Sequence, residues 1–256
     1  MAFVNVLARL RPFALLAVLL LLWELFARHV LPLYEPGAAA LILPPPSAGL
    51  IDAYKLLTQG HLVQHIFASA RRVYVGFAFA ALIGIPLGVL MGMFATAYRQ
   101  LTPVVGVLRP IPPVAWIPVT LLWFGVTDTQ QYFIIFIGTI FPILLNTTSG
   151  VKSVDPVIVR AAMSLGAHSY EMFRVMLIAA LPSIFLGVRI GLGLGWFIIV
   201  ASEMVSASTG LGFLITEART AMITERMYVG MFAIGIIGFL QDRLLAALER
   251  KLIPWK

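Results

Sequence analysis

The chain has 256 residues, of which 61% are hydrophobic and 11% are charged. This composition, with a mean hydropathy of +0.98, excludes an ordinary soluble domain and indicates a protein of the lipid bilayer. The formal net charge is +7, but a basic excess in such a chain reflects basic cytoplasmic loops, so we expect no nucleic-acid partner. Cysteine is absent, which excludes disulfides and thiolate chemistry.

The first apolar segment, 13–33, follows two arginines and could begin a secretory signal peptide. A cleavable signal needs a small-residue site soon after its apolar core, whereas the alanines 38–40 lie far downstream. We therefore expect a retained helix, long enough at about 1.5 Å per residue to cross the hydrocarbon core. Within it, Glu24 and Arg28 have the spacing of an intrahelical ion pair.

Further apolar segments of crossing length recur along the chain, at 66–94, 101–124, 132–150, 178–205 and 228–248. The expected fold class is an all-α membrane protein with about six transmembrane helices. A proline-rich turn after the first crossing precedes an amphipathic helix expected at 47–58, with Ser47 as its N-cap and Asp52 in its first turns. We expect residues 1–61 to form the first crossing and an external amphipathic segment, and residues 62–256 the core.

The distribution of Lys and Arg predicts the orientation, because basic residues favour the cytoplasmic side. With the N-terminus in the cytoplasm, the basic residues expected inside are Arg9, Arg11, Arg99, Lys152, Arg160, Arg174, Arg243, Arg250, Lys251 and Lys256. Those expected outside are Arg28, Lys55, Arg219 and Arg226. Both termini are therefore expected in the cytoplasm.

Two predicted helices carry glycines at four-residue spacing: Gly84, Gly88 and Gly92 in one, and Gly187, Gly191 and Gly195 in the other. Such rows let helix backbones approach closely in a bilayer, and they favour a tightly packed bundle over a direct role with a solute. The third apolar segment is different because it contains Pro103, Pro110, Pro112, Pro113 and Pro118. It cannot form a regular helix, and its freed carbonyl groups require partners in protein or a water-lined cavity, as expected beside a pathway.

The stretch from 157 to 175 is the least hydrophobic part of the second half of the chain. Asp155 and Pro156 can begin a short amphipathic helix there, and Gly166 can end it. A second helix from Ser169, with Glu171 in its first turn, would continue into the fifth crossing. The predicted result is a helical elbow beneath the membrane, although from periodicity alone an interfacial helix that rests on lipid headgroups is the commoner case.

The same stretch resembles a known signature. RAAMSLGA, followed by Leu181 and Pro182, is similar to the cytoplasmic pattern Glu-Ala-Ala, three residues, Gly, then Ile-x-Leu-Pro in the membrane subunits of bacterial ATP-binding-cassette importers. The blocks LRPIPPVAWIPVTLLWFG, FPILLNTTSGVKSVDP, ASEMVSASTGLGFLI and DRLLAALERKLIPW are similar to the nitrate, sulfonate, taurine and bicarbonate branch of that family. The resemblance covers about 62–255. Arg160 departs from it, because the family usually has Glu there, and the first Leu-Pro is missing.

The resemblance implies a multi-pass permease subunit of the bacterial inner membrane, which forms half of a translocation pathway for a small anionic solute. The implied partners are a second permease copy in a homodimer, ATP-binding subunits and an external solute-binding protein. It also implies that the elbow, about 155–172, is a coupling helix that docks on the ATPase subunit. The implied coupling residues are Arg160, Ala161, Ala162, Ser164, Leu165, Gly166 and Ala167.

The sequence contains no Gly-x-x-x-x-Gly-Lys-Ser/Thr phosphate-binding loop. We therefore expect a transport subunit that is not an enzyme and binds no cofactor, with ATP-Mg used by a partner subunit. The four histidines are scattered without ligand spacing, so no metal site is expected.

Two charged residues of the fifth crossing are candidates for the pathway. Arg189 lies about 10 Å of helix rise past Pro182, where a charge needs a partner or a water-filled cavity. We favour a structural bond to backbone carbonyls of a neighbouring helix such as the broken third segment, and the alternative is that Arg189 favours passage of anions. Glu203 is expected near the external surface, paired with Arg219 or Arg226, or else acting as a gate or a contact for a binding protein.

Polar residues 146–149 end the fourth crossing and are expected to hydrogen-bond between helices or to line the inner mouth. The pathway candidates are Arg189, Glu203, Asn146, Pro112, Pro113 and Trp116.

Two other function classes remain as alternatives. An intramembrane enzyme needs a nucleophile with a base, paired aspartates or a His-Glu metal site within the bilayer, whereas this chain offers only Asp242 near a helix end. An autonomous secondary carrier or channel would show internal repeats and several mid-membrane carboxylates, and neither is evident in the sequence.

Overall fold

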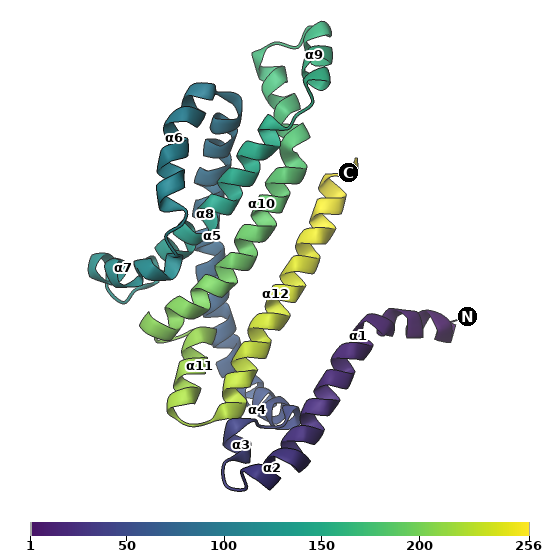
Figure 1. The fold of residues 1–256 in the computed structure, drawn as a ribbon, viewed down its shortest axis with the longest axis vertical. Coiled ribbons are helices and arrows are strands. Elements are labelled where there is room, and N and C mark those ends of the chain that lie inside the picture. Colours follow the sequence, from purple (N-terminus) through teal and green to yellow (C-terminus); the bar gives the residue numbers. More distant parts are fainter. Residues whose placement is uncertain (1, 256) are drawn as a thin grey trace.

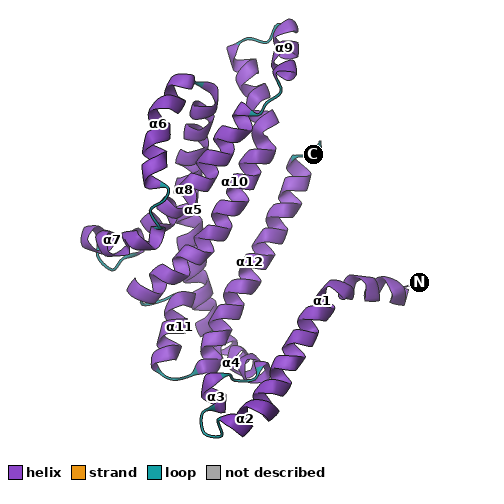
Figure 2. Cartoon of the chain, viewed as in Figure 1, coloured by secondary structure: helices purple, strands orange, loops and turns teal. Residues whose placement is uncertain are grey.

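The computed structural model describes residues 2–255, with side chains described except for residues 2–13, 40 and 169. This part of the chain is helical and has no strands (Figures 1 and 2). In chain order the elements are α1 (Ala2–Leu25), the π-helical turn η1 (Phe26–Val30), α2 (Leu31–Tyr34), α3 (Ala39–Ile42), α4 (Pro46–Thr58), α5 (His61–Met93), α6 (Ala95–Leu108), the 3₁₀ turn η2 (Pro113–Trp116), α7 (Ile117–Phe124), α8 (Asp128–Lys152), α9 (Pro156–Ser164), α10 (Ser169–Ser206), α11 (Leu211–Thr220) and α12 (Thr224–Leu252).

Five helical stretches in the described part of the chain are long and apolar enough to cross a membrane, at Ala14–Tyr34, His61–Met93, Asp128–Lys152, Tyr170–Ser206 and Thr224–Leu252. A sixth crossing is obtained if α6 and the segment Pro113–Phe124 count as one span, and these two are bent by 80° at their junction. The prediction of about six crossings with a broken third segment is therefore confirmed.

Helix α8 lies at the centre of the bundle, between α5 and α10 (Figure 1). Glycines of both flanking helices face it. A Cβ atom added to Gly88 of α5 would lie 2.6 Å from the Cβ of Thr147, and one added to Gly187 of α10 would lie 2.9 Å from the Cβ of Asn146. Because no side chain fits between these backbones, the predicted close packing through the glycine rows is confirmed.

The first crossing contacts the bundle mainly at one end. The indole of Trp23 lies 5.1 Å from the ring of Tyr228 and 5.8 Å from that of Phe232, both on α12. Towards its N-terminus, α1 diverges from α12 (Figure 1). Among the described side chains of residues 14–34, only Ala27 is buried. An apolar helix with so little cover belongs in lipid or against another chain.

The predicted N-cap of the amphipathic helix is wrong. Helix α4 begins at Pro46 after Pro45, and Ser47 makes no cap hydrogen bond. Instead, the Ser47 hydroxyl donates to Glu24 Oε1 at 2.8 Å, and its backbone N–H donates to Glu24 Oε2 at 3.0 Å. The predicted pair of Glu24 and Arg28 is present, at 2.5 Å. The carboxylate of Glu24 therefore fastens α4 to the first crossing, a long-range contact that local capping rules do not contain.

Replacing Gly88 by Ala should destabilise the bundle by about 1–3 kcal/mol, because the added methyl group forces α5 away from α8. Thermal unfolding of the purified protein in nanodiscs measures this change. Gly235 on α12 has nothing within 4 Å of an added Cβ, so Gly235→Ala is the matched control and should unfold at or slightly above the wild-type temperature. Equal behaviour of the two variants would show that the α5–α8 contact tolerates a side chain.

Candidate functional site

A pocket of about 500 Å³ lies where the third crossing breaks, between the proline-rich loop, α8 and α10. We call it the proline-loop pocket. It is lined by Arg109, Ile111, Pro112, Pro113, Val114, Ile137, Gly138, Phe141, Pro142, Leu145, Asn146, Leu194, Phe197 and Ile198. Three of the predicted pathway residues, Pro112, Pro113 and Asn146, are thus brought together.

The sequence explains why the helix breaks beside this pocket. Arg109 N–H makes the last helical bond of α6, to Val105 O at 2.9 Å, and the prolines that follow have no N–H to continue the ladder. Regular hydrogen bonding resumes where Ala115 N–H donates to Pro112 O at 2.9 Å. Gly138 of α8 lets the loop approach, because a Cβ added there would lie 2.9 Å from Pro113 Cγ.

Arg109 is the pocket residue that sequence reasoning did not select. Its side chain is exposed to the pocket, and no hydrogen bond or ion pair of it occurs among the residues whose side chains are described. The signal in the sequence was a lone charge inside a long apolar segment, next to the helix-breaking prolines.

The other predicted pathway residues lie outside this pocket. Trp116 belongs to η2 but is not part of the lining, and its ring lies 6.4 Å from that of Trp123. Arg189 and Glu203 are also absent from the lining, and each is held in an ion pair elsewhere. The predicted pathway set therefore separates into three pocket residues, two residues held in ion pairs, and Trp116, which belongs to neither group.

Glu203 is the centre of a buried ionic cluster with Ser69, Arg72 and Asp128. Arg72 Nη1 donates to Glu203 Oε1 at 2.9 Å, and its Nε donates to Asp128 Oδ1 at 2.7 Å. The Ser69 hydroxyl lies 2.8 Å from both Glu203 oxygens. Glu203 is 1% exposed and Arg72 is 6% exposed, so this pair is out of contact with solvent, whereas the Asp128 side chain is 32% exposed. The cluster joins α5, α8 and α10.

The expected pairing of Glu203 with Arg219 or Arg226 is therefore wrong. Helix α10 turns the Glu203 side chain inward, towards Arg72 on α5, whereas Arg226 contacts Asp52 of α4 at 3.2 Å. Arg219 lies exposed in the last turn of α11. Proximity to the same membrane surface was not enough to identify the partner.

The turn before α11 is built on this ionic cluster. Leu211 N–H donates to Ser69 Oγ at 2.8 Å, and Gly212 N–H donates to Glu203 Oε2 at 3.0 Å. Gly210 has a φ of +125°, and a Cβ there would lie 2.3 Å from the Glu203 carboxyl carbon. Both the backbone conformation and the close approach of the carboxylate require glycine at this position. The sequence Thr-Gly-Leu-Gly, 209–212, therefore forms a turn against which the Glu203 carboxylate packs.

Arg189 makes a two-point ion pair with Asp242 of α12. The distances are 2.5 Å from Nε to Oδ1 and 2.7 Å from Nη2 to Oδ2. The expectation that Arg189 has a structural partner agrees with this geometry, but the expected partner, backbone carbonyls of the broken segment, is wrong. The carboxylate of α12 is the partner because α10 and α12 cross beside each other (Figure 1).

The predicted elbow consists of α9, a turn and the start of α10. Asp155 Oδ1 accepts a hydrogen bond from Val157 N–H at 2.7 Å and so caps α9, and Gly166 ends the turn with a φ of +82°. Glu171 Oε2 accepts from His168 N–H at 3.1 Å at the start of α10. Leu165 is 89% exposed, and α9 projects from the end of the bundle (Figure 1). The seven predicted coupling residues lie together on this projection.

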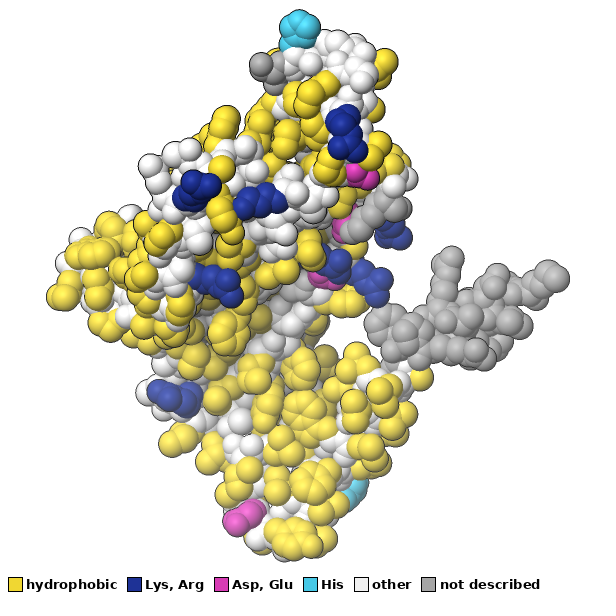
Figure 3. Space-filling model, turned by 45° about the horizontal axis from the view of Figure 1, so that its top comes forward, with side chains coloured by type: hydrophobic (Ala, Val, Ile, Leu, Met, Phe, Trp, Pro, Cys, Tyr) yellow, Lys and Arg dark blue, Asp and Glu magenta, His cyan; other side chains and the backbone are white. Residues whose placement is uncertain are grey.

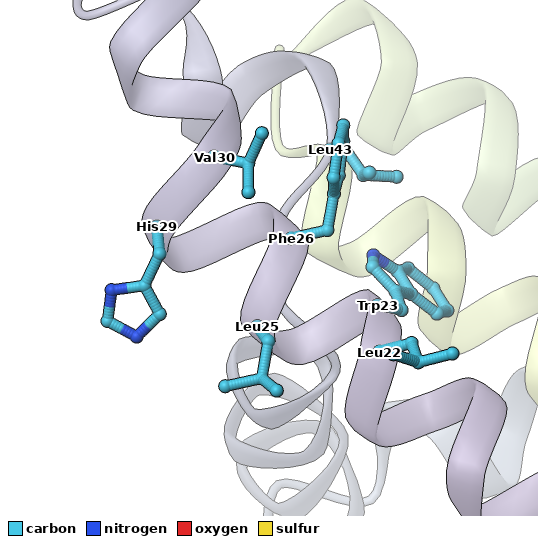
Figure 4. A pocket seen from close by; sticks show the side chains of 7 residues that line it. All are labelled: Leu22, Trp23, Leu25, Phe26, His29, Val30 and Leu43. Carbon is cyan, nitrogen blue, oxygen red and sulfur yellow. The ribbon is translucent and has the colours of Figure 1, made fainter.

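A second hollow, of about 620 Å³, lies beside the first crossing and is lined by Leu22, Trp23, Leu25, Phe26, His29, Val30 and Leu43 (Figure 4). Its lining is almost wholly apolar, and the ring of His29 points away from Trp23 and Leu43. It offers no charged group to a polar solute. The proline-loop pocket is therefore the better candidate for a solute site.

Comparison with known proteins identifies the family of the chain. A family model described as the binding-protein-dependent transport system inner membrane component matches residues 84–254. The taurine transport system permease protein of Escherichia coli is 41% identical, over 94% of this chain and 87% of the relative. The nitrate import permease protein of Synechocystis is 37% identical, over 96% of this chain and 90% of the relative.

A solved structure is also similar. The MetNI methionine ABC transporter in an inward-facing conformation superposes with a TM-score of 0.61 at 22% sequence identity. The match covers 74% of this chain and 97% of the solved chain. At this level of identity the likeness shows the fold.

Glu203→Gln should lower the stability of the bundle by roughly 3 kcal/mol, because it leaves the buried Arg72 with one carboxylate in place of two. The temperature of unfolding, measured in nanodiscs, tests this. Glu35→Gln removes an exposed carboxylate and is the matched control, which should behave as wild type. An unfolding temperature of Glu203→Gln within error of this control would contradict a stabilising ionic cluster.

Arg189→Met and Asp242→Leu should each lower the unfolding temperature, because each leaves one charge of the pair without its partner. The double variant should unfold at a higher temperature than either single variant, since it removes both charges. Simple addition of the two losses in this double-mutant cycle would show that the pair makes no coupled contribution.

Proposed function

Because the chain belongs to the binding-protein-dependent transport inner membrane components, we propose that it forms half of the translocation pathway for a small anionic solute. The observation that carries the proposal is the broken third crossing, which opens a pocket lined by Arg109 and Asn146 among apolar groups. Irregular backbone at membrane depth is tolerated where it lines a cavity. The relatives named for taurine, nitrate, sulfonates and bicarbonate suggest an oxygen-rich anionic group on the solute.

The energy for transport comes, in this proposal, from a separate ATP-binding subunit. The chain has no phosphate-binding loop, so ATP and Mg²⁺ belong to that partner. The elbow at 155–172 is proposed as its docking element. Small side chains such as Ala162 and the projecting position of α9 suit a cleft in another protein. An external solute-binding protein is the remaining partner.

The elbow is proposed to lie on the cytoplasmic side. Seven of the basic residues expected inside have described side chains, and their helices place them towards the α9 end of the bundle. They are Arg99, Lys152, Arg160, Arg174, Arg243, Arg250 and Lys251. Figure 3 agrees, since Lys and Arg gather on the half of the visible face that includes this end. Arg9, Arg11 and Lys256 fall outside the described side chains. Excess basic charge at one end favours the cytoplasm, so both termini are proposed to be cytoplasmic.

A second copy of the chain is proposed as the other half of the pathway. The proline-loop pocket is open on one side, and α6, which precedes it, has no buried residue. The first crossing is almost as uncovered, with Ala27 the one buried residue among its described side chains. A homodimer would cover these apolar surfaces and close the pathway around its two-fold axis.

Ala162→Trp should abolish binding of the ATP-binding subunit while the permease remains folded in the membrane. The reason is that the bulky indole would prevent α9 from fitting into the cleft of the partner. Co-purification with the ATP-binding subunit and solute uptake into proteoliposomes are the measurements. Ala95→Trp, at the first residue of α6 and at the same end of the bundle, is the matched control and should retain both. Normal association and uptake in Ala162→Trp would place the coupling function elsewhere.

A further inference from the structure

We propose that Arg109 makes the proline-loop pocket an electropositive subsite for a small oxyanion, such as a sulfonate, nitrate or bicarbonate group. This inference rests on the proposed function and assigns a binding role to a residue outside the predicted pathway set. Arg109 takes the place of Arg189 as the candidate residue for favouring anions, because Arg189 is ion-paired with Asp242.

The first support is the depth of Arg109 in the bundle. Helix α6 starts at Ala95, next to the turn that follows α5, and its 14 residues rise about 21 Å before Arg109. That distance is most of the roughly 30 Å thickness of the hydrocarbon core. A guanidinium stays charged at such a depth and therefore requires a counter-ion or water.

The second support is that the described chain places no carboxylate at this depth where it could pair with Arg109. Five of the eleven acidic residues form ion pairs in the described structure: Glu24 with Arg28, Asp52 with Arg226, Asp128 with Arg71 and Arg72, Glu203 with Arg72, and Asp242 with Arg189. The remaining ones lie in loops, in α11 or in the end turns of helices: Glu35, Asp155, Glu171, Glu217, Glu225 and Glu249. A second copy carries the same set. Homodimerisation therefore brings no free carboxylate from the middle of a crossing to Arg109.

The third support is the form of the pocket. Its volume of about 500 Å³ is large compared with the roughly 30 Å³ that one water occupies in the liquid, so an oxyanion fits together with part of its hydration shell. Its walls are mainly Pro, Ile, Leu, Val and Phe side chains. Apolar walls screen a charge less than water does and strengthen its attraction for an anion.

Arg109 and Asn146 are the two strongly polar side chains of the lining. The Asn146 amide donates one hydrogen bond, to Pro142 O at 2.8 Å, and its side chain makes no other hydrogen bond among the described residues. A planar guanidinium presents paired N–H donors that match two oxygens of one anion. This donor set favours an oxyanion over a cationic or apolar solute.

The absence of cysteine permits a direct test of the pocket's charge. Val114 lines the pocket and is 40% exposed, so Val114→Cys introduces a single reporter thiol. In nanodiscs, the thiol is treated with the anionic reagent sulfonatoethyl methanethiosulfonate or with its trimethylammonium counterpart. The quantity to be measured is the reaction rate with the anionic reagent divided by the rate with the cationic reagent. This ratio is then normalised to the same ratio for a free thiol in solution.

With Arg109 present, the normalised ratio should favour the anionic reagent. Adding Arg109→Gln should lower the ratio by about threefold or more, whereas Arg109→Lys should keep most of it, because the charge is retained. The matched control is Arg219→Gln, which removes an exposed arginine of α11 that is not part of the pocket, and it should leave the ratio unchanged. Raising the ionic strength should reduce the wild-type preference.

Three results would overturn the proposal. They are a ratio unaffected by Arg109→Gln, an equal loss in Arg219→Gln, and a Val114→Cys thiol that reacts with neither reagent. If Arg109→Gln fails to fold, the salt dependence with Arg109 intact decides instead. The assay needs neither transported solute nor ATPase, so its failure is distinct from failure of the transport function, which uptake into proteoliposomes reports.

Discussion

The close approach of α5 and α10 to the central helix α8 is the constraint on which the rest of the fold depends. Lipid provides no hydrophobic drive for helix association, so van der Waals contact between backbones has to supply it. Glycine faces make that contact possible, and Thr148 Oγ1 adds an interhelical hydrogen bond to Gly88 O at 3.2 Å. Gly138 likewise lets the proline loop pack closely against α8, because a side chain at this position would clash with Pro113. The wall of the pocket is thus a product of the packing.

Among the described residues, Arg72 and Arg189 inside the bundle are paired with carboxylates, whereas Arg109 is not. Arg72 and Arg189 each have carboxylate partners on another helix, so each fastens two or more crossings together. Their pairing gives structure, and it also leaves them without free charge for a solute. Arg109 differs because it lies beside a loop and a pocket. Arg72 and Arg189 thus hold the bundle together, whereas Arg109, beside the helix break, faces a pocket that a ligand can enter.

Sequence patterns predicted the crossings, the broken segment, the glycine packing and the elbow, because each depends on residues close together in the chain. They did not predict the partners of Glu203, Arg189 or Ser47. Arg72 and Glu203 are 131 residues apart, and their contact depends on how α5 and α10 are rotated against α8. Similarly, Ser47 has the local features of a cap, but a carboxylate 23 residues earlier takes its hydrogen bonds. Long-range polar contacts require the tertiary arrangement.

Helix α10 is continuous from Ser169 to Ser206, and its 38 residues span about 57 Å. One end belongs to the elbow, and the other holds Glu203 under the turn that starts α11. The helix therefore joins the elbow to the ionic cluster as one continuous element, with a proline inside it at position 182. A tilt of about 10° would carry one end roughly 10 Å relative to the other over this length. A displacement of the elbow would consequently reach the ionic cluster through a single helix, with no intervening loop to absorb it.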